Sequence, residues 1–263
     1  MSDAAGKTVG MTGPEMLEEV VRELRAEEGV LAVFLAGSHA RGEANEFSDV
    51  DVSVLVASPE QVRNNVSYRD GVLVSVERST LPHRERALTE PEAALWNLVS
   101  LRSGVPLHDP GGAFADLQAR ARAVRWADLA EVAHTLAARR LAGTVEELHK
   151  VMGGLRGGDE GKVTFALVGL TFALGDAALL GSGTLIPTEN RYLTLARDAW
   201  ADPAWRAAYG TLVGLTGEGV RARGRAALVA FGRAVALTRW PDEHDAALAH
   251  GAARRVETFL GGA

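Results

Sequence analysis

Short apolar runs alternate with polar turns along the N-terminal part of the chain. Three of these runs are rich in Val and Leu and have the length of strands. Two further segments carry helical periodicity and begin with capping boxes, Thr12–Glu15 and Thr89–Glu92. The pattern therefore predicts a small domain that contains both strands and helices. Its expected strands are residues 31–36, 50–56 and 72–77, and its expected helices are residues 12–28 and 89–103.

From residue 113 onward the periodicity is helical, with Gly or Pro between most of the apolar stretches. The segment 104–112 is dense in these breakers and predicts a domain boundary. The most apolar stretch, 163–174, is shorter than the about 20 residues that a membrane span requires, so we interpret it as a buried helix. The expected helices lie near residues 113–124, 126–152, 160–180, 188–200, 203–215, 218–239 and 242–260.

These elements predict an α+β fold class, a small sheet domain followed by an all-α helical bundle. The expected organisation is a flexible tail over residues 1–11, a first domain over 12–108 and the bundle over 109–263. Inside the bundle a Gly-rich turn is expected at 153–158, with Lys150 and Lys162 on either side of it facing solvent.

Composition narrows the class of protein. The 263 residues include no cysteine, which excludes disulfides and thiolate chemistry and favours a reducing, cytoplasmic location. The N-terminus has no apolar run behind a basic start, so we expect neither a signal peptide nor a membrane anchor. The net charge is −6. We interpret the arginines of the C-terminal half as the solvent-exposed face of helices. A small-molecule substrate is favoured over nucleic acid.

The residues that carry chemistry gather between the first two predicted strands. Gly37 and Ser38 follow the first strand, and Asp49 and Asp51 stand at the start of the second. Glycine lets the backbone approach a ligand closely, and the serine offers a hydroxyl and an N–H to phosphate oxygens. Arg41 adds a permanent positive charge suited to phosphate.

Alternation along a strand predicts which carboxylates share a face. Asp49 and Asp51 fall on one face of the second strand, opposite a row of valines. Glu77 falls on the polar face of the third strand and joins them if the two strands pair. Carboxylates crowded in this way repel one another unless a cation lies among them, and oxygen ligands suit Mg²⁺. The alternative is that these acids are ordinary charges at strand ends.

Gly37–Gly42 followed by Asp49 and Asp51 closely resembles the signature of the DNA polymerase β-like nucleotidyltransferase superfamily. That signature is Gly-Ser, about ten residues, then Asp-x-Asp on a strand, with a third acid on a later strand. The resemblance covers roughly residues 30–80. A helical domain of this size behind it is similar to the antibiotic nucleotidyltransferases, which adenylylate aminoglycoside hydroxyls. Residues 104–110 are similar to a linker common in such proteins.

The resemblance implies a mixed-sheet nucleotidyltransferase domain that uses ATP or another NTP and two Mg²⁺ ions. Asp49 and Asp51 would bind both metals, and Ser38 would bind the triphosphate next to Gly37. Glu77 would be the third metal ligand or the general base that deprotonates the acceptor hydroxyl. An acid of the helical domain, such as Glu131 or Glu146, is an alternative base by analogy with the kanamycin enzymes.

The predicted function is Mg²⁺-dependent transfer of a nucleoside monophosphate, AMP first, to a hydroxyl of a small molecule, with release of pyrophosphate. The overall acidity favours a cationic acceptor such as an aminoglycoside-like antibiotic. Two alternatives stay open. One is nucleotidylylation of a protein side chain, as in toxin–antitoxin nucleotidyltransferases, although those proteins are usually minimal. The other is a non-catalytic module that binds a nucleotide or a partner.

Overall fold

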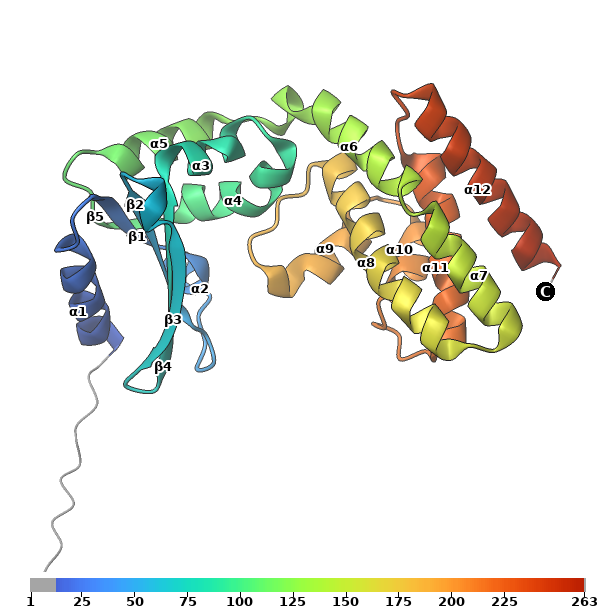
Figure 1. The fold of residues 1–263 in the computed structure, drawn as a ribbon, viewed down its shortest axis with the longest axis horizontal. Helices are drawn as coiled ribbons and strands as arrows, with labels where there is room; N and C mark the ends of the chain where they lie inside the picture. The colour runs from blue at the N-terminus through green and yellow to red at the C-terminus, as the bar shows by residue number, and fades with distance from the viewer. Residues whose placement is uncertain (1–12, 263) are drawn as a thin grey trace, which may run out of the picture. The chain divides into compact units, whose positions relative to one another are not determined.

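The computed structural model describes residues 13–262, which form two compact units (Figure 1). The first unit comprises the residues up to 88 together with 97–124, and the second comprises 89–96 with everything from 125 onward. The α+β fold class is confirmed, because a mixed sheet is followed by helices alone. The expected tail over 1–11 and the capping residue Thr12 lie outside the described residues.

A five-stranded mixed sheet in the order β3-β4-β2-β1-β5 forms the centre of the first unit. Strand β2 is parallel to β4 and antiparallel to β1, and the remaining pairs are antiparallel. The strands are β1 (Val30–Leu35), β2 (Val50–Val56), β3 (Arg63–Arg69), β4 (Val72–Thr80) and β5 (Val105–His108). The three predicted strands are therefore confirmed, and β4 extends three residues beyond its expected end.

The hydrophobic pattern did not predict strand β3, because almost all of its side chains are polar and exposed. It lies at the edge of the sheet and pairs with β4 through a two-residue turn, in which Asp70 and Gly71 both have positive φ angles of 49° and 82°. Such a turn is typical of a tight hairpin. An edge strand buries little, so it needs no apolar alternation and leaves no hydrophobic signal.

The aliphatic face of the sheet packs against helix α1 (Gly13–Arg25). Met16, Val20 and Leu24 of this helix form one buried cluster with the valines of β2 at positions 50, 52, 54 and 56. Figure 1 shows α1 lying beside the strands. Because neighbouring side chains of a strand point to opposite faces, this packing places Asp51 and Ser53 on the other face of the sheet.

Helix α5 (Ala113–Ala123) belongs to the first unit, whereas the expected boundary after residue 108 places it with the bundle. Its Phe114 stacks on Phe34 of β1, with ring centroids 3.9 Å apart and an interplanar angle of 8°. Gly104 allows this approach, since a Cβ there would lie 2.8 Å from Phe114 Cζ. The breaker-rich segment 104–112 thus contains a paired strand, β5, and a turn within the unit.

The remaining helices of the N-terminal part are α2 (Gly37–Arg41), α3 (Leu81–Glu85) and α4 (Pro91–Ser103).

The second unit is helical, as predicted. Its large buried cluster centres on α8 and includes Trp205, Tyr209 and Phe231. The expected helix over 126–152 is broken at Gly143 and Thr144. The helices are α6 (Ala130–Ala142), α7 (Val145–Gly157), α8 (Glu160–Ser182), α9 (Tyr192–Asp198), α10 (Pro203–Leu212), α11 (Val220–Leu237) and α12 (Glu243–Gly261).

The expected Gly-rich turn at 153–158 is mostly helix. Helix α7 continues to Gly157, and Gly158 ends it with a φ angle of 72°. Gly154 is a packing residue, because a Cβ there would lie 2.7 Å from Val163 Cγ2 of α8. The glycine that suggested a turn therefore serves close contact between two helices.

Among the described residues, α8 is the one helix that is long and apolar enough to cross a membrane. More than half of its most apolar stretch is buried inside the second unit. Its buried side chains belong to the large apolar cluster of the second unit, which agrees with the interpretation as a core helix.

We predict that Phe114→Ala destabilises the protein by about 3–5 kcal/mol, because it removes a fully buried ring from the contact between α5 and β1. Denaturant unfolding measures the effect. The matched control is Phe165→Ala in α8, whose side chain is 70% exposed and whose loss should change stability by no more than about 0.5 kcal/mol. Equal effects of the two substitutions would contradict the assignment of α5 to the sheet.

Candidate active site

Gly37 and Ser38 lie at the end of β1, in the short helix α2 rather than in the expected turn. The backbone N–H of Ala36 donates to the carbonyl of Asp51 at 2.8 Å, so the pairing of β1 with β2 continues up to the motif. Helix α2 ends at Gly42, which has a φ angle of 69°. The local structure thus holds Gly37 directly against the start of β2.

Gly37 is required by its conformation and by its neighbour. Its φ angle is 63°, a left-handed conformation that L side chains rarely adopt. A Cβ at this position would lie 1.9 Å from Oδ2 of Asp51, which is far inside van der Waals contact. The Asp51 carboxylate therefore occupies the space that every other residue type would fill. The sequence motif predicts that Gly37 and Asp51 belong to one site, and the structure shows that they lie directly against each other.

Asp51 lies in β2, and Asp49 immediately precedes this strand. Both residues are half-buried. Burial, together with the nearby Asp49 and Glu77 carboxylates, raises the pKa of Asp51 to about 6, although Arg41 and His39 act in the opposite direction. The predicted crowding of negative charge is therefore present around Asp51. His39 itself is exposed on α2.

The register between β2 and β4 places Glu77 on the same side of the sheet as Asp51. Asp51 pairs with Ser75, and Ser53 pairs with Glu77, so the two acids are diagonal neighbours. The expectation that the third strand pairs beside the second is confirmed. The Glu77 side chain is 44% exposed and accepts a hydrogen bond at Oε2 from Arg84 Nη2 at 2.6 Å.

Arg84 is the residue that the sequence interpretation missed. Its side chain is only 5% exposed, and besides Glu77 it donates to Ser79 Oγ at 2.6 Å and to Asn97 Oδ1 at 3.2 Å. A weaker contact of 3.4 Å joins it to Ser53 Oγ. A buried guanidinium with this many acceptors holds them in one arrangement. No local pattern could have identified it, because its partners come from β2, β4 and α4.

Arg41 carries a polar atom that lacks a partner. Its Nε donates to Glu43 Oε2 at 2.9 Å, and its side chain is 10% exposed. Its Nη1 is buried and has no hydrogen-bond partner among the described residues. A buried donor without a partner is costly and calls for an explanation, such as a ligand oxygen.

A divalent cation fits part of this group of acids. The mutual repulsion of the Asp49 and Asp51 carboxylates is what a cation would relieve. Within residues 13–262, however, no three His, Asp or Glu side chains are arranged as a ready metal site. Since Arg84 already engages one oxygen of Glu77, Asp49 and Asp51 are the pair that fits the ion.

The two alternative candidates for the general base lie outside the first unit. Glu131 is exposed on α6 and Glu146 is exposed on α7, both in the second unit.

A cavity of about 740 Å³ borders Ser48 and is lined by Met16, Val50 and Val72. Val50 belongs to the aliphatic face of β2, so this cavity is on the α1 side of the sheet, opposite Asp51.

Comparison with known proteins agrees with the motif. Residues 17–96 match the model of the nucleotidyltransferase domain family, a range that includes Gly37, Asp51 and Glu77. The nucleotidyltransferase-like protein from Exiguobacterium sibiricum 255-15 matches with 15% sequence identity over 92% of this chain and 77% of that chain, at a TM-score of 0.48. The comparison with curated proteins gave no match. The family match over residues 17–96 confirms the predicted nucleotidyltransferase domain.

We predict that Gly37→Ala abolishes binding of Mg²⁺ and nucleotide, because the new methyl group displaces the Asp51 carboxylate. Gly42→Ala is the matched control, since it has nearly the same φ angle and nothing within 4 Å of a Cβ. Both substitutions should cost about 1–2 kcal/mol of stability from backbone strain. Calorimetric titration should show that only the Gly42 variant still binds. Retention of binding by both would contradict the role of the contact.

We predict that the Asp51 carboxylate lowers stability as the pH rises. An acid whose pKa is about 6 in the folded protein and 3.8 ordinarily binds more protons when folded, so stability falls through that window and the cost is complete above it. Asp51→Asn should therefore gain stability relative to the wild type between about pH 4 and about pH 8. Unfolding measured at both pH values checks this. A constant difference between the two proteins would contradict it.

Proposed function

We propose that this protein is a Mg²⁺-dependent nucleotidyltransferase that moves a nucleoside monophosphate, AMP first, from an NTP to a hydroxyl of a small molecule. The proposal starts from the nucleotidyltransferase domain at residues 17–96. The observation that carries it is the acidic face of the sheet, where Asp51 fits against Gly37 beside Asp49 and Glu77. A desolvated carboxylate among other acids is an unfavourable arrangement unless it binds a cation.

The donor half of the site consists of residues around α2. Asp49 and Asp51 hold the metal, which when bound neutralises phosphate charge and polarises the phosphorus to be attacked. Ser38 offers its hydroxyl to the triphosphate. Arg41 directs its unpartnered Nη1 to a phosphate oxygen, which satisfies the buried donor.

Glu77 receives the proton of the acceptor hydroxyl. The acceptor oxygen forms a bond to the α-phosphorus, the bond from that phosphorus to the bridging oxygen breaks, and pyrophosphate leaves with the electron pair. Arg84 orients the Glu77 carboxylate by binding Oε2, which leaves Oε1 for the substrate. Arg84 is a positioning residue, because it contacts Glu77 and no reacting atom.

The acceptor is a cationic small molecule, with an aminoglycoside-like antibiotic as the first candidate. The net charge of −6 supports a cationic acceptor and argues against a polyanion. The absence of cysteine supports a reducing, cytoplasmic location. Nucleotidylylation of a protein and nucleotide binding without turnover are the alternatives that the experiment separates.

We predict that the protein with Mg²⁺ and ATP releases pyrophosphate when a hydroxylated amine is added. Asp49→Asn and Asp51→Asn should each lower the rate at least about a hundredfold, because several kcal/mol of charge stabilisation is lost. Glu18→Gln, an exposed acid of α1, is the matched control and should keep the full rate. Pyrophosphate is assayed for four NTPs against a panel of aminoglycosides.

The same assay distinguishes the alternatives. Label transfer from NTP to a protein instead of the amine would replace the acceptor assignment. Tight nucleotide binding without release of pyrophosphate on any acceptor would support the non-catalytic module. A Glu77→Gln variant that keeps its rate and its pH profile would move the base to another acid, such as Glu131 or Glu146.

A further inference from the structure

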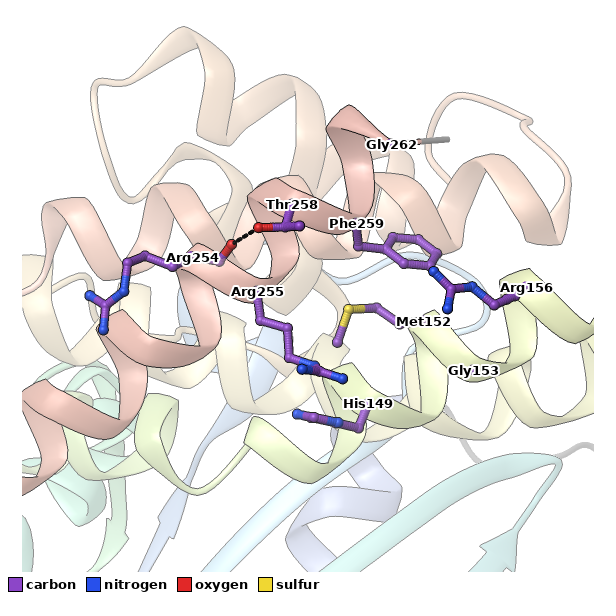
Figure 2. Close-up of a pocket in the computed structure, with 9 residues that line it drawn as sticks. All are labelled: His149, Met152, Gly153, Arg156, Arg254, Arg255, Thr258, Phe259 and Gly262. Carbon is purple, nitrogen blue, oxygen red and sulfur yellow. Dashed lines mark hydrogen bonds between the residues drawn. The ribbon is translucent and has the colours of Figure 1, made fainter.

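The second unit contains a basic pocket that the proposed function does not use. It has a volume of about 510 Å³ and lies between α7 and α12 (Figure 2). Its lining includes three arginines and a histidine, Arg156, Arg254, Arg255 and His149, together with Met152 and Phe259. We call these six residues the basic pocket. Its volume is within the range of about 300–1,000 Å³ that is usual for small-molecule sites.

The cations of the basic pocket have no carboxylate partner among the described residues. Neither Arg254 nor Arg255 takes part in any of the ion pairs of that part of the chain, whereas Arg197 and Arg233 in the same unit pair with Asp198 and Asp202. No Asp or Glu lines the pocket. The whole chain holds 34 acidic residues against 28 lysines and arginines, so composition alone does not explain a carboxylate-free group of arginines.

Several of these side chains face a common space, whereas Arg254 extends away from it (Figure 2). Figure 2 shows the Arg255 guanidinium directed toward the His149 ring, with Met152 beside them. Arg156 lies over the ring of Phe259, with its guanidinium carbon 5.7 Å from the ring centroid. Hydrogen-bond donors from both helices therefore face one space, and an apolar thioether and an aromatic ring border it. Lys162 of α8 brings another positive charge close, since its Nζ lies 3.3 Å from where a Cβ on Gly153 would be.

We propose that the basic pocket binds a phosphate-bearing small molecule. The phosphate accepts hydrogen bonds from Arg255 and His149, because a guanidinium matches two phosphate oxygens at once. The organic part of the molecule packs on Met152 and Phe259, and Arg156 closes that side. The ligand is a small molecule rather than a polynucleotide, since the site is a pocket of a volume usual for small-molecule sites and the net charge of the chain is −6. This site is independent of the proposed transfer reaction.

The test follows the His149 side chain by NMR while inorganic phosphate, a sugar phosphate or AMP is added at constant ionic strength with EDTA and no Mg²⁺. We expect the His149 resonances to shift and saturate. Arg255→Gln and Arg156→Gln should each weaken binding about tenfold or more, which is the effect expected for losing one charged hydrogen bond. Arg225→Gln, an exposed arginine of α11 outside the pocket, is the matched control and should bind as the wild type does.

Three further measurements make the outcome decisive. Ser38→Ala should leave the His149 shifts unchanged, which separates the basic pocket from the candidate active site. Arg255→Lys keeps the charge and should retain part of the affinity, and circular dichroism checks that each variant is folded. The three ligands distinguish a site for free phosphate from one for an organic phosphate. Absence of a saturable shift at millimolar ligand, or equal affinity in the glutamine variants and the wild type, would overturn the proposal.

Discussion

The first unit depends on one constraint, the two-sided environment of strand β2. On one side its valines at positions 50, 52, 54 and 56 are buried against α1, which holds the strand in the centre of the sheet. Because side chains alternate, the same strand must direct Asp51 and Ser53 to the other side. There the carboxylate of Asp51 meets Gly37 and the register with β4 brings Glu77 near. A shift of one residue would exchange the acids with the valines, so the apolar core also maintains the position of the candidate active site.

The polar face of the sheet is arranged at a cost in stability. Burial and neighbouring acids raise the pKa of Asp51 to about 6, which means that its charged form is disfavoured in the folded protein. Arg84 has the opposite effect, since its buried guanidinium binds Glu77 and Ser79 and thereby holds β4 and α3 together. The face therefore combines Asp51, whose charged form is disfavoured, with Glu77, which a buried guanidinium holds. That difference is the reason to assign the metal to Asp49 and Asp51 and the proton to Glu77.

Several elements could not be predicted from local pattern. Strand β3 is polar and exposed, so its existence depends on the backbone bonds that β4 offers. Strand β5 lies in a segment rich in Gly and Pro and is ordered by pairing with β1. Helix α5 has an ordinary helical pattern, yet the stacking of Phe114 on Phe34 assigns it to the sheet. The helix through Gly154 shows the same limit, because a glycine that suggests a turn locally serves close packing against Val163.

By itself, the sequence determined the three apolar strands, the helical second unit and the presence of a nucleotidyltransferase motif. Burial periodicity and the spacing of Gly37, Asp49 and Asp51 are local properties, and they survive in any fold that buries the valines. Only the tertiary structure decided that Arg84 holds Glu77, that α5 covers the sheet and that Arg156 and Arg255 meet His149 in one pocket. These contacts depend on the packing of different elements against one another, and their energies depend on burial and on partners that a one-dimensional pattern does not contain.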